Sequence, residues 1–478
     1  MPTARVRMYR HGLGDCFLLT FTDTDGNDAH ALIDCGSLGG GEISKSDAIE
    51  LVGKHIGDDG LSLLVITHEH DDHVGAFRFK DGKKFLAETE IANVWLAWTE
   101  DPNDPDAQAA AQHINDLGRA VVAAQSMPGI DAKLADRVDS LLGFVGEPAL
   151  RFANSVNDAM HRVRTETTGR VRYLSPGDGP IEPAWAPGFR FYVLGPPRAE
   201  NARKNEGKHG SEELYGFRAA LRAAGAVPNG IDLPEEHEAA PFDARYTNRG
   251  AITRSALYPN YDTEENSWRK IDTDWMHGVA DLALQLDHQI NNTSLVLAIE
   301  RIADGKVMLF PGDAQEGSWL SWHGDAISWS VEDPDGDERQ VNAADLLSRT
   351  VFYKVGHHGS HNATAKGKGL ELMGPDLVAF IPVSRETALE RNPKGSWKMP
   401  AKLLYTRLLE RCRGRVIRSD IGWAAEVPAD TADKTEKEFI GIGSNDSWED
   451  WREAQASAQE SGILDIDNQN PFYDFVLK

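Results

Sequence analysis

A cluster of histidines and acidic side chains directly after an apolar run constrains this chain more than any other feature. Residues 67–73 read Thr-His-Glu-His-Asp-Asp-His and follow the apolar run 61–66, which predicts a buried strand. Imidazole and carboxylate groups are ligands that zinc and other borderline divalent cations accept readily. On an irregular turn His68 and His70 can face one side, while Asp72 and His73 face the other. One short loop at the carboxyl end of a strand can therefore serve two adjacent metal ions.

A second apolar run, residues 307–310, leads to Gly312 and Asp313. A strand followed by Gly-Asp is on its own ordinary turn chemistry. A carboxylate placed between two cations, however, can bridge them and hold them roughly 3.5–4 Å apart, as two-metal hydrolysis requires. Beside the first cluster, Asp313 is therefore expected to be a bridging ligand.

A third apolar run, residues 351–355, enters a loop that reads Gly-His-His-Gly-Ser-His at 356–361. One imidazole, for which we choose His358, would complete the shell of the second metal. The other, His357, could hydrogen-bond the substrate or donate a proton to it. His357 or His361 could instead support the ligands by hydrogen bonds, and Ser360 is a candidate contact for the substrate.

Together these motifs resemble the metallo-β-lactamase superfamily, whose pattern is HxHxDH after a strand, a later Gly-Asp and a final His. The resemblance implies an α/β fold, an αββα sandwich, and a site for two divalent metal ions. The implied ligands are His68, His70, Asp72, His73, Asp313 and His358. Residues 31–36 also look like the family's early strand and its Asp-Cys-Gly turn. There Asp34 would support the metal loop, although a purely structural cap is the other interpretation.

Within the superfamily, four segments look like the branch that contains the hydrolase domain of the DNA-uptake competence channel protein. They are residues 11–16, residues 291–296, the His-His-Gly-Ser loop and residues 415–420. The likeness extends over about residues 5–100, 170–198 and 290–427. One departure concerns a further His ligand of many relatives, whose position here holds Asn291 or Asn292. Either an asparagine oxygen or a water replaces that ligand, or His288, slightly upstream, fills the place.

The extent of the resemblance implies one hydrolase domain over residues 1–427 with two insertions. Residues 101–170, rich in Ala, Asp and Arg with apolar residues three to four apart, predict a helical insertion. Residues 199–285 mix Pro, Gly, Asn and charge without a period, which predicts a long irregular excursion, either a lid or a surface segment. Residues 428–478 are acidic and predict an appendage, with Trp448 and Trp451 on a helix that could recruit a protein partner.

Composition restricts the partners and the compartment. The 478 residues carry 75 acidic and 50 basic side chains, and the formal charge of −25 weakens the case for non-specific nucleic-acid binding. Local basic patches can override this, and the clearest is residues 391–418; Lys394 and Lys398 there are candidate substrate contacts, while a solvated helix face is the plainer interpretation. Three cysteines without CxxC spacing, the lack of a signal peptide and the lack of a membrane-spanning run favour the cytoplasm.

The resemblance implies a metal-dependent hydrolase, with zinc as the default metal and manganese or iron as alternatives. A hydroxide activated by two metals would attack the substrate, and Asp72 could orient it. The branch likeness and the basic segment favour a phosphodiester, either a nucleic acid or a small nucleotide, so the expected activity is that of a phosphodiesterase or nuclease. The alternatives are a small-molecule phosphoester or carbon-ester hydrolase, and a metal-binding interaction module of a multi-protein system.

Overall fold

The apolar runs of the sequence form two packed β-sheets in a computed structural model of the protein. The structure describes residues 1–125, 156–204, 286–324, 326–333, 336–391, 399–423 and 445–478. The larger sheet has eight strands in the order β16-β17-β1-β2-β3-β4-β5-β6, and the smaller has seven in the order β15-β14-β13-β12-β9-β8-β7. A separate two-stranded hairpin joins β10 (Ser328–Glu332) to β11 (Glu338–Asn342).

The larger sheet is antiparallel at one side and parallel at the other. Its strands are β1 (Thr3–Tyr9), β2 (Cys16–Thr22), β3 (Asp28–Cys35), β4 (Leu63–Val65), β5 (Asn93–Ala97), β6 (Arg170–Leu174), β16 (Leu464–Asp465) and β17 (Phe472–Leu477). Pairing is parallel from β3 through β4 and β5 to β6. The loops that follow these four strands therefore leave the sheet at the same edge.

The smaller sheet repeats this arrangement. Its strands are β7 (Phe189–Gly195), β8 (Val296–Arg301), β9 (Val307–Phe310), β12 (Thr350–Lys354), β13 (Val378–Ile381), β14 (Val416–Arg418) and β15 (Gly422–Trp423). The neighbours β9, β12, β13 and β14 are parallel, so their carboxyl ends also share one edge. Aromatic side chains join the two sheets; the rings of Phe17 on β2 and Phe310 on β9 meet edge to face at 6.1 Å between centroids.

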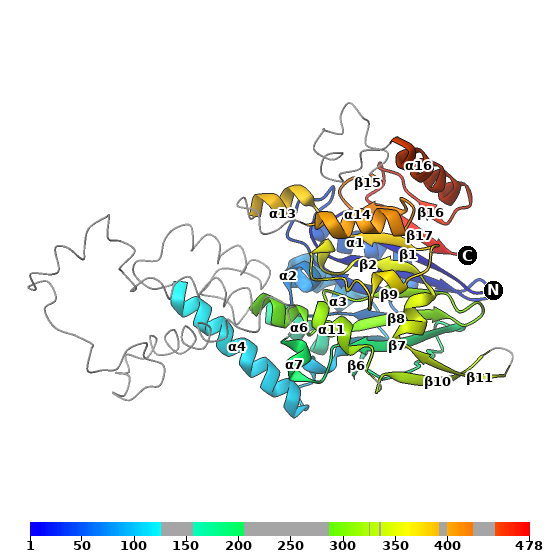
Figure 1. Cartoon of the computed structure of the whole chain (residues 1–478). Helices are drawn as coiled ribbons and strands as arrows, with labels where there is room; N and C mark the ends of the chain where they lie inside the picture. Colours follow the sequence, from blue (N-terminus) through cyan, green and yellow to red (C-terminus); the bar gives the residue numbers. More distant parts are fainter. Residues whose placement is uncertain (126–155, 205–285, 325, 334–335, 392–398, 424–444) are drawn as a thin grey trace, which may run out of the picture.

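Helices cover the outer face of each sheet, which confirms the predicted αββα sandwich (Figure 1). The larger sheet carries α1 (Lys45–Ile56), α3 (Lys80–Glu88) and α6 (Val156–Thr165), with the short turns η1 (Gly57–Asp59) and η2 (Gly75–Arg78). The smaller sheet carries α11 (Glu316–Ser321), α12 (Ala343–Ser348), α13 (Arg385–Arg391), α14 (Lys402–Arg411) and the turn η8 (Leu370–Leu372). Apolar side chains on the inner side of each helix extend the core beyond the sheets.

Helix α1 illustrates how local sequence sets these boundaries. Ser44 accepts a hydrogen bond from the Asp47 backbone, and the Asp47 side chain accepts one from the Ser44 backbone, so the two residues form a capping box. Gly57, with φ of 55°, ends the helix in a conformation that favours glycine. Between them Ile49, Val52 and Ile56 recur on one face and are buried against the sheet.

Both predicted insertions lie partly outside the described residues. The first contains α4 (Pro105–Gln125) and α6, and residues 126–155 between them are not described. Helix α4 projects away from the sandwich at its left-hand side in Figure 1. The second begins with α7 (Glu200–Arg203), and residues 205–285 are not described. Of the helices that the structure describes, none is long and apolar enough to cross a membrane.

The predicted acidic appendage is wrong for residues 464–477, which form two strands of the larger sheet. Strand β17 lies between β16 and β1 and pairs with β1 from Ala4–Leu477 to Tyr9–Phe472. Its acidic residue Asp474 obscured the strand in the sequence, but both carboxylate oxygens accept hydrogen bonds from Arg7, at 2.8 and 2.7 Å. Helix α16 (Asn445–Glu460) precedes these strands, and its Trp451 is buried. The predicted boundary at residue 427 lies outside the described residues.

Candidate metal centre

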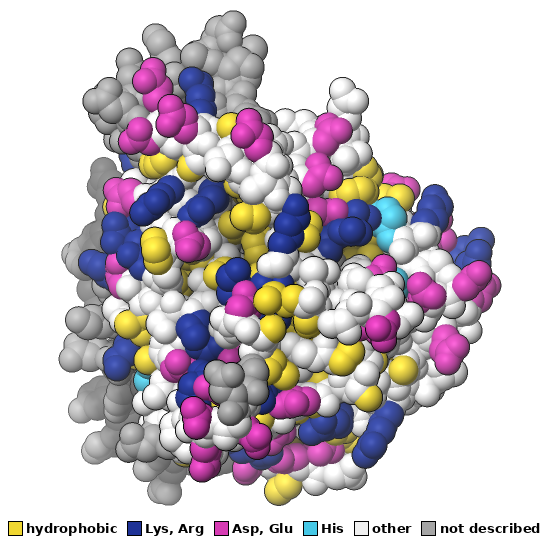
Figure 2. All heavy atoms as spheres, turned by 90° about the vertical axis from the view of Figure 1, so that its right-hand side faces the viewer, with side chains coloured by type: hydrophobic (Ala, Val, Ile, Leu, Met, Phe, Trp, Pro, Cys, Tyr) yellow, Lys and Arg dark blue, Asp and Glu magenta, His cyan; other side chains and the backbone are white. Residues whose placement is uncertain are grey.

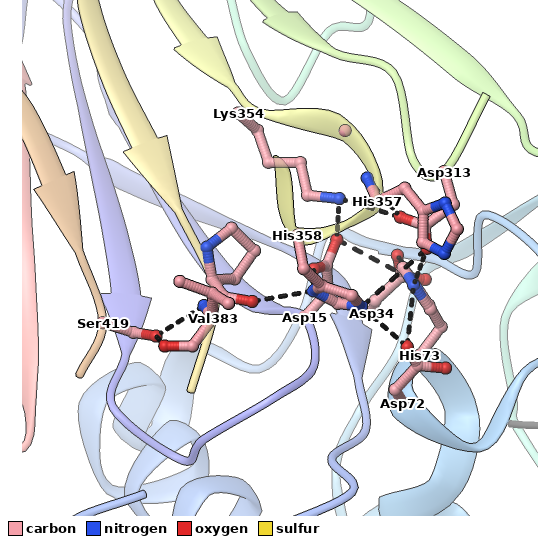
Figure 3. Close-up of polar contacts among 12 residues, drawn as sticks. Asp15, Asp34, Asp72, His73, Asp313, Lys354, His357, His358, Val383 and Ser419 are labelled. Carbon is pink, nitrogen blue, oxygen red and sulfur yellow. Dashed lines mark hydrogen bonds and ion pairs between the residues drawn. The ribbon is translucent and has the colours of Figure 1, made fainter. Parts of the chain in front are cut away.

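Five loops bring histidines and aspartates together at the shared edge of the two sheets. From the larger sheet come Asp15 between β1 and β2, Asp34 at the end of β3, and residues 67–73 after β4, where the short helix α2 (Asp71–Val74) begins. From the smaller sheet come Asp313 after β9 and the turn η7 (Gly356–Gly359) after β12. Figure 3 shows these side chains converging from both sheets. All six predicted ligands are at most 1% exposed.

Asp34 holds the metal loop in place. Its carboxylate accepts hydrogen bonds from the backbone N–H of Thr67 at 2.8 Å, from the Thr67 hydroxyl at 2.7 Å, and from Nδ1 of His73 at 2.8 Å. Asp34 adopts a φ of 57°, a left-handed conformation that few non-glycine residues take and that concentrates at functional sites. The proton on Nδ1 of His73 leaves its Nε2 lone pair directed to the other side of the ring.

His358 is fixed in the same tautomer by a carbonyl group. Its Nδ1 donates to the backbone oxygen of Pro382 at 2.7 Å, and Ser419 anchors the next residue, Val383, through its backbone N–H and carbonyl at 2.8 and 2.9 Å (Figure 3). His358 itself has a left-handed φ of 52°. Its Nε2 therefore points at Oδ2 of Asp72, only 2.8 Å away.

These contacts leave lone pairs facing one another. Nε2 of His73 lies 3.2 Å from Oδ2 of Asp313, and neither atom makes a hydrogen bond within the described chain. Oδ1 of Asp72 is likewise buried without a hydrogen bond among those residues. Because imidazole nitrogens and carboxylate oxygens in this arrangement repel unless a proton or a cation lies between them, the geometry fits a bound metal.

The pKa directions indicate the same demand for positive charge. Burial lowers the pKa of His73, but the neighbouring charges of Asp313 and Asp15 outweigh burial and hold it well above its usual value. Burial raises the pKa of Asp72, but His73 and His358 outweigh burial and bring it to about 2. Asp72 is thus ionised, and in the absence of a metal ion His73 holds the proton that supplies positive charge beside it.

His68 and His70 form a second, neutral pair of donors. Nε2 of His68 lies 3.0 Å from Nδ1 of His70. Nδ1 of His68 is within 3.1 Å of the Thr67 hydroxyl and 3.2 Å of the Ser294 hydroxyl, so it can donate there and leave Nε2 unprotonated. Burial lowers the pKa of His70 to about 4 and that of His68 well below its usual value. Two neutral imidazole nitrogens this close can hold one metal ion between them.

The asparagines that replace a histidine in the sequence occupy different environments. Asn292 uses both ends of its amide: Nδ2 donates to the carbonyl of Arg203 at 3.0 Å, and Oδ1 accepts from the backbone of Gln315 at 3.1 Å. Asn291 donates to Asp287 at 3.1 Å, and its buried Oδ1 accepts no hydrogen bond within the described chain. The carboxylate of Asp287 also lies 3.9 Å from Nε2 of His70. Asn291 is therefore the better placed of the two to complete a shell beside His70.

His288 has a partner away from the predicted ligands. Its Nδ1 lies 2.8 Å from the Gln315 side-chain amide, and burial lowers its pKa to about 4. Among the other candidates, His361 is exposed, and Ser360 donates to the Asn362 side chain at 3.0 Å. Lys394 and Lys398 lie outside the described residues.

Sequence reasoning missed Asp15 and Lys354. Lys354 is 1% exposed; its ammonium group pairs with Asp15 and lies 2.9 Å from the Gly312 carbonyl and 3.2 Å from Oδ1 of Asp313. Oδ1 of Asp313 also accepts the backbone N–H of His357 at 3.0 Å. Oδ1 is thereby occupied, and Oδ2 remains for a metal. A lysine inside an apolar strand was the available signal for this contact.

Asp15 supports the histidines from behind. Its carboxylate oxygens lie 3.7 Å from Nδ1 of His73 and 3.9 Å from Nδ1 of His358. Each of Asp15, His73, Asp313 and His358 offers one ligand atom, and the four atoms lie within 4.8 Å of one another. This is a buried cluster able to bind a metal ion, and its imidazole and carboxylate donors suit zinc, manganese and iron.

Comparison with known proteins agrees with this geometry. No curated protein matches the chain. A family model does match its first third, and the matched segment contains Asp15, Asp34 and the complete metal loop. That model describes the metallo-beta-lactamase superfamily, whose members are largely metal-dependent hydrolases, and it matches residues 10–148 of this protein.

Proposed function

We propose that this protein is a two-metal hydrolase of phosphodiesters. The observation that carries the proposal is a set of buried imidazole nitrogens and carboxylate oxygens that lie 2.8 to 3.2 Å from one another: His68 and His70, His358 and Asp72, and His73 and Asp313. When bound, two divalent cations would supply Lewis acidity and lower the pKa of water toward neutrality. His68 and His70 would hold one ion, His73, Asp72 and His358 would hold the other, and Asp313 would contribute its Oδ2 to the centre.

The protein's own groups have distinct tasks in this proposal. Asp72 keeps Oδ1 without a hydrogen bond among the described residues, so it can accept a hydrogen bond from the attacking water and orient it. Burial lowers the pKa of His357 to about 3, so this imidazole is neutral at pH 7. Of the two roles that the sequence left open for His357, a hydrogen bond to the substrate or proton donation to it, we therefore choose the hydrogen bond to a substrate oxygen.

The choice of a phosphodiester rests on the likeness to the competence-protein branch, on residues 11–16, 291–296, 356–360 and 415–420. A long nucleic-acid strand is a weaker candidate than a small phosphodiester. In the basic segment Arg407 pairs with Glu371 and Arg418 with Asp420, each at 2.7 Å, so these charges are used internally. On the face drawn in Figure 2, basic and acidic side chains alternate without a large area of one sign.

The test is hydrolysis of bis-p-nitrophenyl phosphate and of labelled single- and double-stranded DNA by metal-loaded protein. His70→Ala should abolish turnover, whereas His161→Ala, a matched change of an exposed histidine on α6, should leave it unchanged. Cleavage of the small ester alone supports a phosphodiesterase that acts on small substrates, and cleavage of DNA as well makes the protein a nuclease. No cleavage of either substrate with two metals bound, or full activity in His70→Ala, would overturn the proposal.

A further inference from the structure

A cavity of about 210 Å³ lies beside the metal loop and is not used by the proposed chemistry. It is bounded by α4, by α6 and by the turn η3 (Trp98–Glu100), which follows β5. Strands β4 and β5 are parallel neighbours, with Val65 paired to Trp95. Glu69 after β4 and Glu100 after β5 therefore emerge at the same edge of the sheet and line the same cavity.

The cavity lining carries more acidic than basic side chains, and burial together with the charge of Glu100 raises the pKa of Glu69 to about 8. Its acidic residues are Glu69, Glu100 and Asp101, and its one basic residue is Arg164. Arg164 is already committed, since Nη1 lies 3.2 Å from the carbonyl of Glu100 and 3.4 Å from its carboxylate. Within the described chain the Glu69 carboxylate has neither a hydrogen bond nor an ion pair, although it is only partly exposed. A carboxylate sheltered from water without a partner is costly, so this one calls for a cationic donor.

A second, independent observation points to a ligand in the same place. Thr99 lines the cavity and is 8% exposed, and its hydroxyl oxygen is buried without any hydrogen-bond partner in the described part of the chain. A buried hydroxyl normally finds a partner, because leaving it unpaired costs about 1–3 kcal/mol. The cavity thus contains both an unpaired acceptor and an unpaired hydroxyl.

One part of the remaining wall is apolar, and it is the part that an aliphatic body can contact. It consists of small or aliphatic side chains from α4, α6 and the segment before β8: Ala107, Ala110, Ala111, Ile114, Val156 and Ile290. The polar side chains of Gln108, Asn115, Asn157 and Thr293 complete the lining. A metal ion would not suit this wall. Among the described residues, the cluster of three or more metal-ligating side chains is the one at the metal centre, and it does not include Glu69 or Glu100. A cation with a short aliphatic body fits both the charge and the wall.

We propose that this cavity binds an organic cation, a primary ammonium group on a short aliphatic chain. The ammonium group donates to the carboxylates of Glu69 and Glu100 and to the Thr99 hydroxyl, and the aliphatic part lies against α4. The inference does not depend on the hydrolase proposal, because none of these side chains holds a metal there.

Three probes with one aliphatic body and different head groups test the inference: n-butylammonium, n-butanol and butyrate. Each is titrated calorimetrically into the full-length protein, once metal-free and once metal-loaded. Butylammonium should bind in both states, and at least tenfold more tightly than butanol or butyrate. Equal affinities for the three, or no binding of butylammonium, would overturn the inference even if the protein proves to be a hydrolase.

Matched variants locate the binding site. Glu69→Gln and Glu100→Gln, which keep the side-chain shape, should each weaken butylammonium binding about tenfold, as expected for the loss of one charge-assisted hydrogen bond. Thr99→Val should weaken it less. Glu50→Gln, at an exposed position of α1, is the control and should bind as the unmodified protein does. Unchanged affinity in both glutamate variants, with unchanged melting temperatures, would place the cation elsewhere and refute the assignment.

Discussion

We expect the buried Lys354 to be essential to the stability of the metal-free protein, and Lys354→Met tests this. Methionine is similar in length but carries no charge, so the substitution leaves the carboxylates of Asp15 and Asp313 without their buried cation. Removing one partner from a buried ion pair costs about 3–5 kcal/mol, because the remaining charge stays desolvated. That is a large share of the roughly 5–15 kcal/mol by which domains are usually stable.

A double-mutant cycle can isolate the interaction energy between Lys354 and Asp15. Urea unfolding is followed by tryptophan fluorescence in the presence of a chelator, for Lys354→Met, for Asp15→Asn, and for the two combined. In the double variant one of the stranded charges is absent, so the loss of unfolding free energy should be smaller than the sum of the two single losses, by at least about 1 kcal/mol. Additive losses would show that the two side chains do not interact, and a loss under about 1 kcal/mol for Lys354→Met would refute the argument from burial.

Two further substitutions test the support of the metal loop. Asp34→Asn weakens the acceptor of the His73 proton, so metal affinity should fall about 10- to 100-fold in a titration with zinc, while Asp28→Asn, near the other end of β3 and exposed, should not change it. Gly36→Ala places a Cβ 2.4 Å from backbone atoms of Asp72 and His73, so we expect a loss of about 1–3 kcal/mol in unfolding free energy together with fewer bound metal ions. Gly367→Ala meets no atom within 4 Å and serves as its control; equal behaviour of the two glycine variants would contradict the prediction.

The parts of the fold and site predicted correctly are those in which a local pattern carries the information. Short apolar runs that end in polar residues predicted β4, β9 and β12, because a buried parallel strand must be apolar and its carboxyl end opens on a loop. The motifs after those strands met in space because parallel neighbours share one edge. The sequence could therefore predict both the αββα sandwich and the region where the histidines gather.

The parts that were missed depend on pairs of residues far apart in the chain. Lys354 contacts Asp15, and Arg7 contacts Asp474, so each charge is explained only by a partner more than three hundred residues away. Considered alone, a lysine argues against a buried strand, and an aspartate suggests an exposed position. The cavity beside Glu69 has the same origin, since its walls come from four separate segments, at residues 69, 99–115, 156–164 and 290–293. No local period encodes such contacts.

Because β17 pairs with β1, the larger sheet can be completed only after β17 has been synthesised. Strand β1 is made first, yet its partner β17 is made some 460 residues later, so the edge of β1 stays unpaired for roughly 20–90 s at ordinary elongation rates. The guanidinium group of Arg301 donates hydrogen bonds to the carbonyls of Pro2, Leu477 and Lys478. These contacts too are incomplete until β17 has been synthesised. Contacts so distant in sequence slow folding, and an open strand edge invites aggregation. Additional chaperone capacity during synthesis should therefore improve the soluble yield of this protein.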